Sequence, residues 1–244
     1  MVQNTKNEEF KPSECVLAVC SYNAATRKLK NLLGTGFLIS NQVALTAKHI
    51  LSDYDKDVLS LKIILIDRID GIHIFDTEVL QQSEKYDIVA LNIAGIEESP
   101  FLEMTDSSLF NNHDYLTVEY SETSFNQKQG SKKEEVTFRP STRKGNIVKS
   151  YVSEFPEKTP TKVLEVSFPV LQGASGAPLM ENKPPWRVAG MITHNVQYQL
   201  MPAQIVSIID GDDYIEETQY FLPTGKAIDV YHLKEFIAEL LYKI

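Results

Sequence analysis

The stretch Gly173-Ala174-Ser175-Gly176-Ala177-Pro178-Leu179 places a serine between two glycines in the last third of the 244-residue chain. Glycine has no Cβ atom, so the backbone beside Ser175 can adopt dihedral angles that are closed to other residues. A tight turn here can direct the amides of Gly173 and Ser175 at one point, where they would stabilise an oxyanion forming beside the Ser175 hydroxyl. An ordinary surface turn can have the same composition, so the motif needs support from the rest of the chain.

A histidine and an aspartate upstream provide that support. A serine hydroxyl is a poor nucleophile until a neighbouring base accepts its proton, so a serine-based site also needs a placed histidine and a carboxylate. His49 follows the apolar segment 43–47, and Asp87 opens the apolar run 88–91. The order His, Asp, Ser is that of chymotrypsin-like enzymes and differs from the orders of α/β-hydrolases and subtilisins. The rival carboxylates near His49 precede no comparable apolar run: Asp53, Asp55, Asp57 and Asp76.

Four blocks together resemble the trypsin-like (chymotrypsin-fold) serine peptidases, in their bacterial intracellular branch. They are GTGFLI at 34–39, TAKH at 46–49, DIVAL at 87–91 and GASGAPL at 173–179. The resemblance implies that Ser175 is the nucleophile, His49 the general base, and Asp87 the carboxylate that orients His49. It implies an oxyanion hole made by the amides of Gly173 and Ser175, and no need for a cofactor or metal ion. The spacing of His and Cys residues also contains no metal-binding pattern.

The resemblance extends to a substrate-binding wall. It implies that Thr193, His194 and Asn195 flank the side chain before the scissile bond, and that the base of that pocket starts near Pro169 to Gln172. Pro169 stands where trypsin has an aspartate, so a preference for Arg or Lys by that device is not expected. His194 could pair with an acidic substrate side chain, as a cleft histidine does in glutamyl endopeptidases, or could be a solvent-facing loop residue.

One position departs from the secreted members of the family. Ala174 replaces the aspartate that receives a newly cut N-terminus in those enzymes, so activation by N-terminal cleavage is not expected. Control would then come through loops or a regulatory protein partner. Residues 194–218 are expected to be long and irregular, and are either a place for specificity and control or a surface insertion.

Segments with β character predict an all-β fold. In the first half they are 15–21, 32–39, 43–46, 58–69, 72–80 and 88–93; in the second half they are 115–120, 136–139, 146–152, 162–168, 177–180, 186–193, 219–222 and 226–228. Residues 121–135 are expected to form a polar loop. Apolar residues at helical spacing predict a C-terminal helix over 229–241, with Asp229 as its N-cap. Composition alone indicates a sandwich or a barrel.

The resemblance makes the architecture more specific. It implies two packed six-stranded antiparallel β-barrels followed by the C-terminal α-helix. The expected division is a tail at 1–13, a first barrel at 14–97 with His49 and Asp87, a connection at 98–113, and a second barrel with the helix at 114–244 that carries Ser175.

Composition limits the function. A net charge of −9 argues against nucleic-acid binding through phosphate contacts. No stretch approaches the roughly 18 apolar residues of a membrane span, so no membrane contact is expected. The N-terminus has no apolar run typical of a signal peptide. Cys15 and Cys20, five residues apart on an expected strand, should face opposite sides, so no disulfide framework is expected. These features favour a cytoplasmic protein.

The leading hypothesis is a serine endopeptidase that acts on a protein or peptide substrate through an acyl-enzyme on Ser175. The alternative is a catalytically idle trypsin-like module that holds a peptide in its cleft. An α/β-hydrolase esterase is disfavoured, because the motif is GxSG instead of GxSxG and the strands do not alternate with helices.

Overall fold

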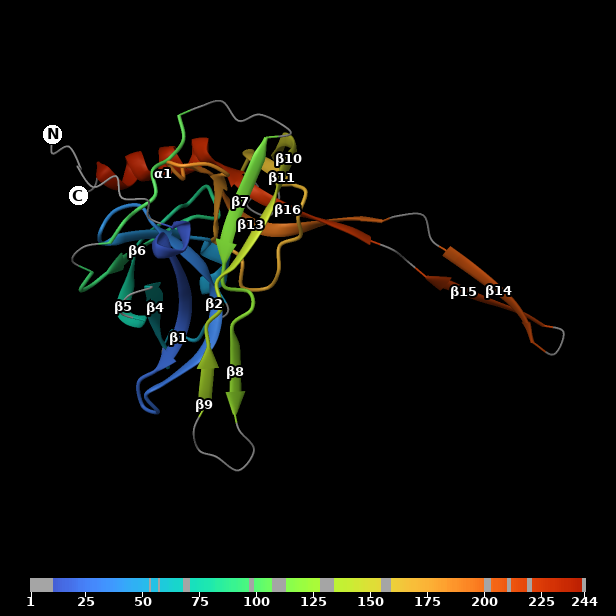
Figure 1. The fold of residues 1–244 in the computed structure, drawn as a ribbon, viewed down its shortest axis with the longest axis horizontal. Coiled ribbons are helices and arrows are strands. Elements are labelled where there is room, and N and C mark those ends of the chain that lie inside the picture. The colour runs from blue at the N-terminus through green and yellow to red at the C-terminus, as the bar shows by residue number, and fades with distance from the viewer. Residues whose placement is uncertain are drawn as a thin grey trace.

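Strands make up most of the molecule (Figure 1). The computed structural model describes residues 11–52, 54–56, 58–67, 71–96, 99–106, 113–127, 134–154, 159–199, 203–209, 212–218 and 221–242. Within these residues the chain forms sixteen strands, one α-helix and two short 3-10 helices. The all-β prediction is confirmed.

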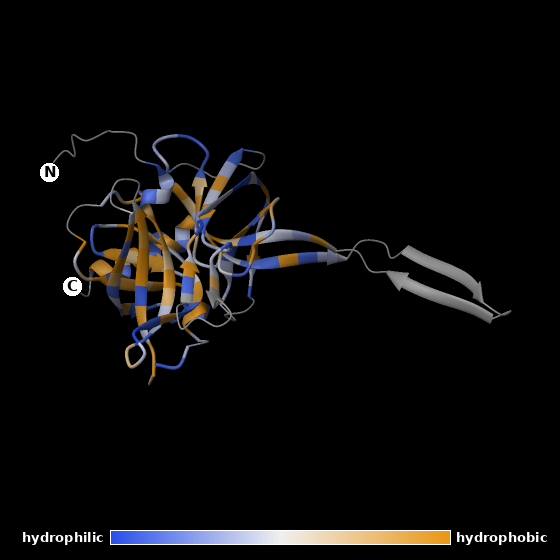
Figure 2. Ribbon diagram, turned by 60° about the horizontal axis from the view of Figure 1, so that its bottom comes forward, coloured by the Kyte–Doolittle hydropathy of each residue, from blue (hydrophilic) through white to orange (hydrophobic). Residues whose placement is uncertain are grey.

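The first barrel closes in the strand order β1-β2-β3-β6-β5-β4, and neighbouring strands are antiparallel. Its strands are β1 (Val16–Asn23), β2 (Lys28–Leu38), β3 (Val43–Thr46), β4 (Ser60–Asp67), β5 (Gly71–Gln82) and β6 (Val89–Ile93). Leu17, Phe37, Leu45, Ile63 and Leu91 on its strands are fully buried. Figure 2 shows apolar residues recurring along these strands. The barrel therefore has a packed apolar core.

The second barrel closes in the order β10-β11-β16-β13-β12-β7. Its strands are β7 (Asp114–Glu119), β10 (Ser141–Ser153), β11 (Thr161–Val166), β12 (Pro178–Glu181), β13 (Val188–Gln199) and β16 (Phe221–Asp229). The prediction of two six-stranded antiparallel barrels is confirmed.

Two predicted loops are wrong, because both contain paired strands. Within 121–135, β8 (Ser124–Gln127) begins a hairpin with β9 (Glu134–Thr137). Within 194–218, β13 continues to Gln199 against β16, and β14 (Ala203–Ile209) pairs with β15 (Asp212–Thr218). The β14–β15 hairpin lies away from the barrels (Figure 1).

The extension of β13 lacks the pattern that reveals barrel strands. Asn195, Gln197 and Tyr198 lie on the extension of β13 and are exposed, so no apolar alternation is required of them. The Asp-Gly pair at 210–211, which separates the two strands of the outer hairpin, is a favoured hairpin sequence and was the available signal.

The cysteines also differ from expectation. Cys15 ends the 3-10 helix η1 (Pro12–Cys15), while Cys20 lies in β1, so the two are not on one strand. Both are buried and unpaired. Burial raises the pKa of both thiols, that of Cys20 to about 12, so they stay protonated and unreactive at neutral pH.

The C-terminal helix α1 (Val230–Leu241) packs beside the barrels (Figure 1). The Asp229 carboxylate caps it by accepting a hydrogen bond from the amide of Tyr231 at 2.9 Å, which confirms the predicted cap. The imidazole of His232 accepts a hydrogen bond from the amide of Lys162 on β11 at 2.8 Å, which ties the helix to the second barrel.

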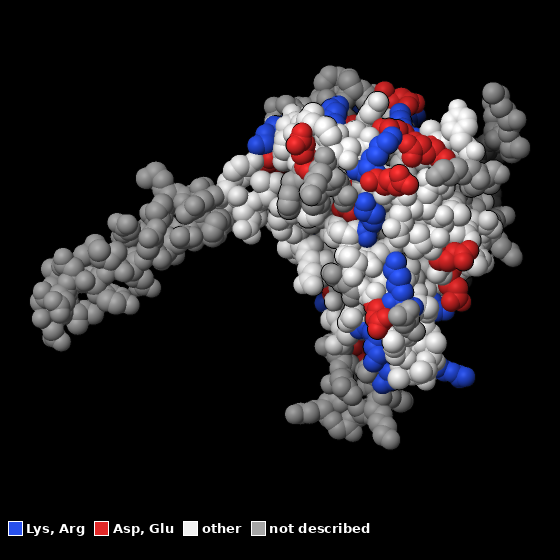
Figure 3. Space-filling view, turned by 180° about the vertical axis from the view of Figure 1, so that it is seen from behind, with Lys and Arg blue, Asp and Glu red and all other residues white. Residues whose placement is uncertain are grey.

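On the face seen in Figure 3, basic and acidic side chains are interspersed. At the surface of the C-terminal helix, the ammonium group of Lys85 bridges Glu235 and Glu239 of α1 at 3.0 and 3.3 Å. The described part of the chain contains no helix with the length and apolar character needed to cross a membrane.

The glycine after Ser175 lies where the serine loop meets the first barrel. Gly176 has a φ of +89°, and a Cβ atom there would lie 2.1 Å from the carbonyl oxygen of Thr35 and 2.2 Å from the hydroxyl of Thr46. Gly71 has a similar φ of +92°, but nothing lies within 4 Å of its Cβ position. Comparing alanine substitutions at these two glycines therefore separates the free-energy cost of the backbone conformation from the cost of a steric clash.

Gly176→Ala is expected to destabilise the fold by about 3 kcal/mol or more, because it adds a clash with backbone to the unfavourable φ. Gly71→Ala carries only the unfavourable φ and is expected to cost about 1 kcal/mol. Urea denaturation of both variants measures the difference. Equal losses would mean that the serine loop does not pack tightly against the first barrel.

Candidate active site

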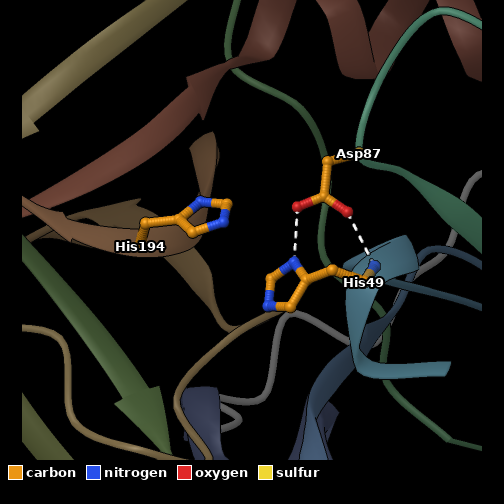
Figure 4. A group of neighbouring side chains, drawn as sticks. All are labelled: His49, Asp87 and His194. Atoms are coloured by element: carbon orange, nitrogen blue, oxygen red, sulfur yellow. Dashed lines mark hydrogen bonds and ion pairs between the residues drawn. The ribbon is translucent and has the colours of Figure 1, made fainter. Parts of the chain in front are cut away.

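His49 and Asp87 form a hydrogen-bonded pair at the edge of the first barrel (Figure 4). His49 lies on the 3-10 helix η2 (Lys48–Leu51), directly after β3. Its Nδ1 atom lies 2.6 Å from one carboxylate oxygen of Asp87, and its backbone amide donates to the other oxygen at 2.8 Å. A carboxylate only accepts, so Nδ1 carries the hydrogen, and in the neutral imidazole Nε2 then keeps its lone pair. That lone pair is the feature a general base needs.

Burial differs sharply within this pair. The side chain of Asp87 is 3% exposed, whereas that of His49 is 34% exposed. The carboxylate is therefore held against the barrel wall while one edge of the imidazole faces solvent. This arrangement suits a base that meets a substrate and a carboxylate that does not.

Asp87 is held by the turn before it. The hydroxyl of Ser83 accepts a hydrogen bond from the amide of Tyr86 at 3.0 Å, and the amide of Ser83 donates to the carbonyl of Ile88 at 2.9 Å. The phenol of Tyr86 donates to Glu235 of α1 at 2.8 Å. Burial and this hydrogen bond raise the pKa of Tyr86 to about 12, so the phenol remains a donor at neutral pH. The C-terminal helix thus supports the segment that carries Asp87.

Ser175 lies on the loop between β11 and β12, in the second barrel. The flanking amides are used within the fold: that of Ala174 donates to the carbonyl of Leu171 and that of Gly176 to the carbonyl of Ile192. Among the described residues, no acceptor is bonded to the amides of Gly173 and Ser175. Gly173 has a φ of +93°, a conformation that favours glycine. Both amides are therefore available to an oxyanion.

Thr35 of β2 anchors this loop to the first barrel. Its amide donates to the carbonyl of Ser175 at 2.9 Å, and its hydroxyl donates to the carbonyl of Gly173 at 2.7 Å. The same hydroxyl accepts from the amide of Tyr120 at 3.1 Å. These bonds join the serine loop to the barrel that carries the His49–Asp87 pair, so they set the distance between the two halves of the site.

The hydroxyl of Ser175 donates to the carbonyl of Thr193 at 2.9 Å, and not to His49. The strand that holds the Ser175 hydroxyl also reaches His49, because His194 follows Thr193 and its ring lies 4.8 Å from the ring of His49. Gly34 also contacts both sides, since its Cβ position lies 2.7 Å from the carbonyl oxygen of Ser175 and 2.9 Å from Ile50. Turning the Ser175 side chain to another staggered rotamer would release the hydroxyl from Thr193.

Residues 34–191 match the model of the trypsin-like peptidase domain, which is well over half of the chain. The chain belongs to the trypsin-like peptidase family. The match includes His49, Asp87 and Ser175.

Solved structures of serine proteases share the fold of this trypsin-like peptidase. The active form of the Rv3671c protease from M. tuberculosis superposes with a TM-score of 0.59 at 16% identity, over 94% of this chain and 82% of that chain. The serine endoprotease from Yersinia pestis gives 0.55 at 17% identity, over 95% of this chain and 64% of its own length. Deg5 gives 0.53 at 16% identity, over 75% and 80%. No curated protein sequence matches the chain.

The predicted substrate-binding residues of the peptidase fall into two groups. On β13, Thr193 is buried and accepts from Ser175, and the ring of His194 is tilted by 31° against that of His49. Asn195 bonds to the backbone of Val170. Pro169 and Gln172 lie ahead of Ser175 on the loop between β11 and β12, half-buried and exposed respectively. The structure thus brings Thr193 and His194 to the candidate catalytic residues, while Asn195 bonds to Val170 on the loop that carries Ser175.

One group of side chains in the described residues could hold a metal ion. His49, Asp87 and His194 each offer one ligand atom, and these atoms lie within 4.8 Å of one another. A cation bound there would compete for the carboxylate oxygen that His49 uses.

Two buried charged residues on the second barrel of the peptidase were not predicted. Lys226 pairs with His194 in the sheet, and its ammonium group donates to Ser153 at 2.9 Å. Burial lowers the pKa of Lys226, against the opposing effect of the Asp87 carboxylate. Glu165 is the second, and it accepts from Tyr198 at 2.7 Å and Thr224 at 2.9 Å. Neither residue stands in a sequence pattern that would single it out.

Glu165 is expected to make stability depend on acid. Its burial raises its pKa, but hydrogen bonds from Tyr198, Lys149 and Thr224 outweigh that effect and hold the pKa below its ordinary 4.5. The stabilisation is therefore complete above pH 4.5 and is lost as the pH falls through the lower, folded-state pKa. Glu165→Gln is expected to lower the free energy of unfolding by about 1–2 kcal/mol at neutral pH. Urea denaturation at a series of pH values should then show a smaller loss of stability in acid than for the wild type. The same loss of stability in both proteins would mean that other carboxylates cause it.

Proposed function

We propose that this trypsin-like peptidase is a serine endopeptidase that works through an acyl-enzyme on Ser175. The observation that carries the proposal is the His49–Asp87 pair, in which Nδ1 is bonded to a buried carboxylate and Nε2 is left as a base. The pairing stabilises the imidazolium that forms when His49 accepts a proton.

The proposed reaction has two halves. The Ser175 oxygen attacks the carbonyl carbon of the peptide while its proton passes to Nε2 of His49. The resulting oxyanion receives hydrogen bonds from the amides of Gly173 and Ser175, which have no other acceptor among the described residues. When the C–N bond breaks, His49 returns the proton to the leaving amine. Water, activated by the same histidine, then hydrolyses the ester and restores the serine.

The Ser175 hydroxyl must turn away from Thr193 before the attack. Its present hydrogen bond to that carbonyl, at 2.9 Å, is a weak restraint compared with the backbone contacts of the loop. A peptide that enters the cleft would compete for this carbonyl and favour the rotation.

The same hydrogen bond supports a second candidate, the idle module that binds a peptide without cleaving it. Incubating the protein with unfolded casein and a mixed peptide library, and sequencing the products by mass spectrometry, separates the two. We expect new termini that are absent with the Ser175→Ala protein. Peptides that are retained by the folded protein but released intact would favour the idle module.

A further inference from the structure

Asn195 joins the segment that was expected to flank the substrate side chain to the segment that was expected to start the base of its pocket. Its side-chain oxygen accepts a hydrogen bond from the amide of Val170 at 2.6 Å, and its side-chain nitrogen donates to the carbonyl of the same residue at 2.5 Å. Asn195 lies on β13 next to His194, and Val170 belongs to the segment that leads to Ser175. One amide side chain therefore spans the space between the two walls. Asn195 is itself exposed, so these two hydrogen bonds lie on the solvent side of the space between the two segments.

The space behind the bridge is filled. Gly225 of β16 is the sheet partner of Asn195. A Cβ atom on Gly225 would lie 2.6 Å from a methyl of Val166, 2.8 Å from the carbonyl oxygen of Phe168 and 2.9 Å from a methyl of Val170. Val166, Phe168 and Val170 are all at most 6% exposed. A substrate side chain that passed Asn195 would therefore meet packed apolar groups instead of a pocket.

We propose that Asn195 is a specificity-determining residue that closes the site for the side chain preceding the scissile bond, so that the enzyme cuts after glycine, alanine or serine. The inference rests on the proposed peptidase function. A larger side chain would have to displace the Asn195 amide and leave the Val170 N–H and C=O without their partner. It would also have to push apart Val166 and Val170, which are closely packed. A small residue needs neither change.

The test uses peptides that differ only in the residue before the cut. For the wild-type protein we expect kcat/KM with alanine or glycine at that position to exceed the value with leucine, phenylalanine, lysine or glutamate by roughly tenfold or more. The bridge also holds the backbone of Val170 in place beside Gly225. Asn195→Gly lets that segment yield to a larger side chain, so we expect it to raise kcat/KM for the leucine peptide relative to the alanine peptide by roughly tenfold. Gln197→Gly is the matched control, an exposed residue on the same strand with no bond to Val170, and its preference should equal that of the wild type.

The outcomes distinguish this inference from the function on which it rests. Cleavage after large residues that depends on Ser175 would overturn the inference and leave the peptidase intact. An Asn195→Gly protein that melts like the wild type but keeps the wild-type preference would also overturn it. If that variant does not fold, Asn195→Ala and the wild-type profile decide the matter. Absence of any cleavage would overturn the proposed function, and the inference with it.

Discussion

Ser175→Ala is expected to lower kcat for peptide cleavage by roughly 10⁴- to 10⁶-fold, because the oxygen that forms the acyl-enzyme is removed. The Ser175 hydroxyl makes one hydrogen bond, to the Thr193 carbonyl, so its loss should change the melting temperature little. The carbonyl of Ser175, which accepts from Thr35, is untouched and continues to hold the loop. Steady-state kinetics on a fluorogenic peptide, with melting curves, measure both effects.

Ser60→Ala is a matched control, because Ser60 is an exposed serine on β4 whose hydroxyl lies 3.5 Å from its acceptor. It should keep full activity. Wild-type turnover by the Ser175→Ala protein would show that the peptide bond is broken by some other group.

Asp87→Asn is expected to lower kcat by about 10⁴-fold. Asparagine can keep a bond to the backbone amide of His49, but its NH₂ group can face Nδ1 and favour the tautomer with hydrogen on Nε2. The lone pair would then point at residue 87 and not at Ser175, and the imidazolium would lose its counter-charge. The measurement is kcat with saturating peptide, because substrate binding does not involve this buried group.

Asp76→Asn provides the comparison. Asp76 was a rival to Asp87 by its proximity to His49 in sequence, but its side chain is 77% exposed and pairs with Lys62 at the surface. Its replacement should leave kcat unchanged. Equal activity of the two variants would show that Asp87 takes no part in catalysis.

The sequence is most informative where local chemistry and burial agree. The all-β character and the helix capped by Asp229 follow from apolar periodicity and turn residues, whereas the two-barrel architecture was implied by the family resemblance. The pairing of His49 with Asp87 was implied by family resemblance, and their 2.6 Å contact depends on the turn fixed by Ser83 and on α1. No periodicity reveals that Tyr86 reaches Glu235, because the partners lie 149 residues apart.

Other parts of the site depend on long-range geometry that sequence patterns do not contain. The hydroxyl of Thr35 connects Gly173 with Tyr120, but a threonine in a strand is ordinary. Asn195 was expected beside a substrate, yet its bond to Val170 follows only from the closed barrel. The exposed extension of β13 escaped prediction because strands without a buried face carry no apolar alternation.

Covalent labelling of the folded protein with a fluorophosphonate probe, read by intact mass and peptide mapping, tests most directly whether Ser175 is a nucleophile activated by His49. We expect a single adduct on Ser175 in the wild type. We also expect His49→Ala to slow labelling by roughly 10²- to 10⁴-fold, because the base that activates the serine is gone. No adduct on the folded wild-type protein, or equal labelling rates in the two proteins, would contradict the proposed mechanism.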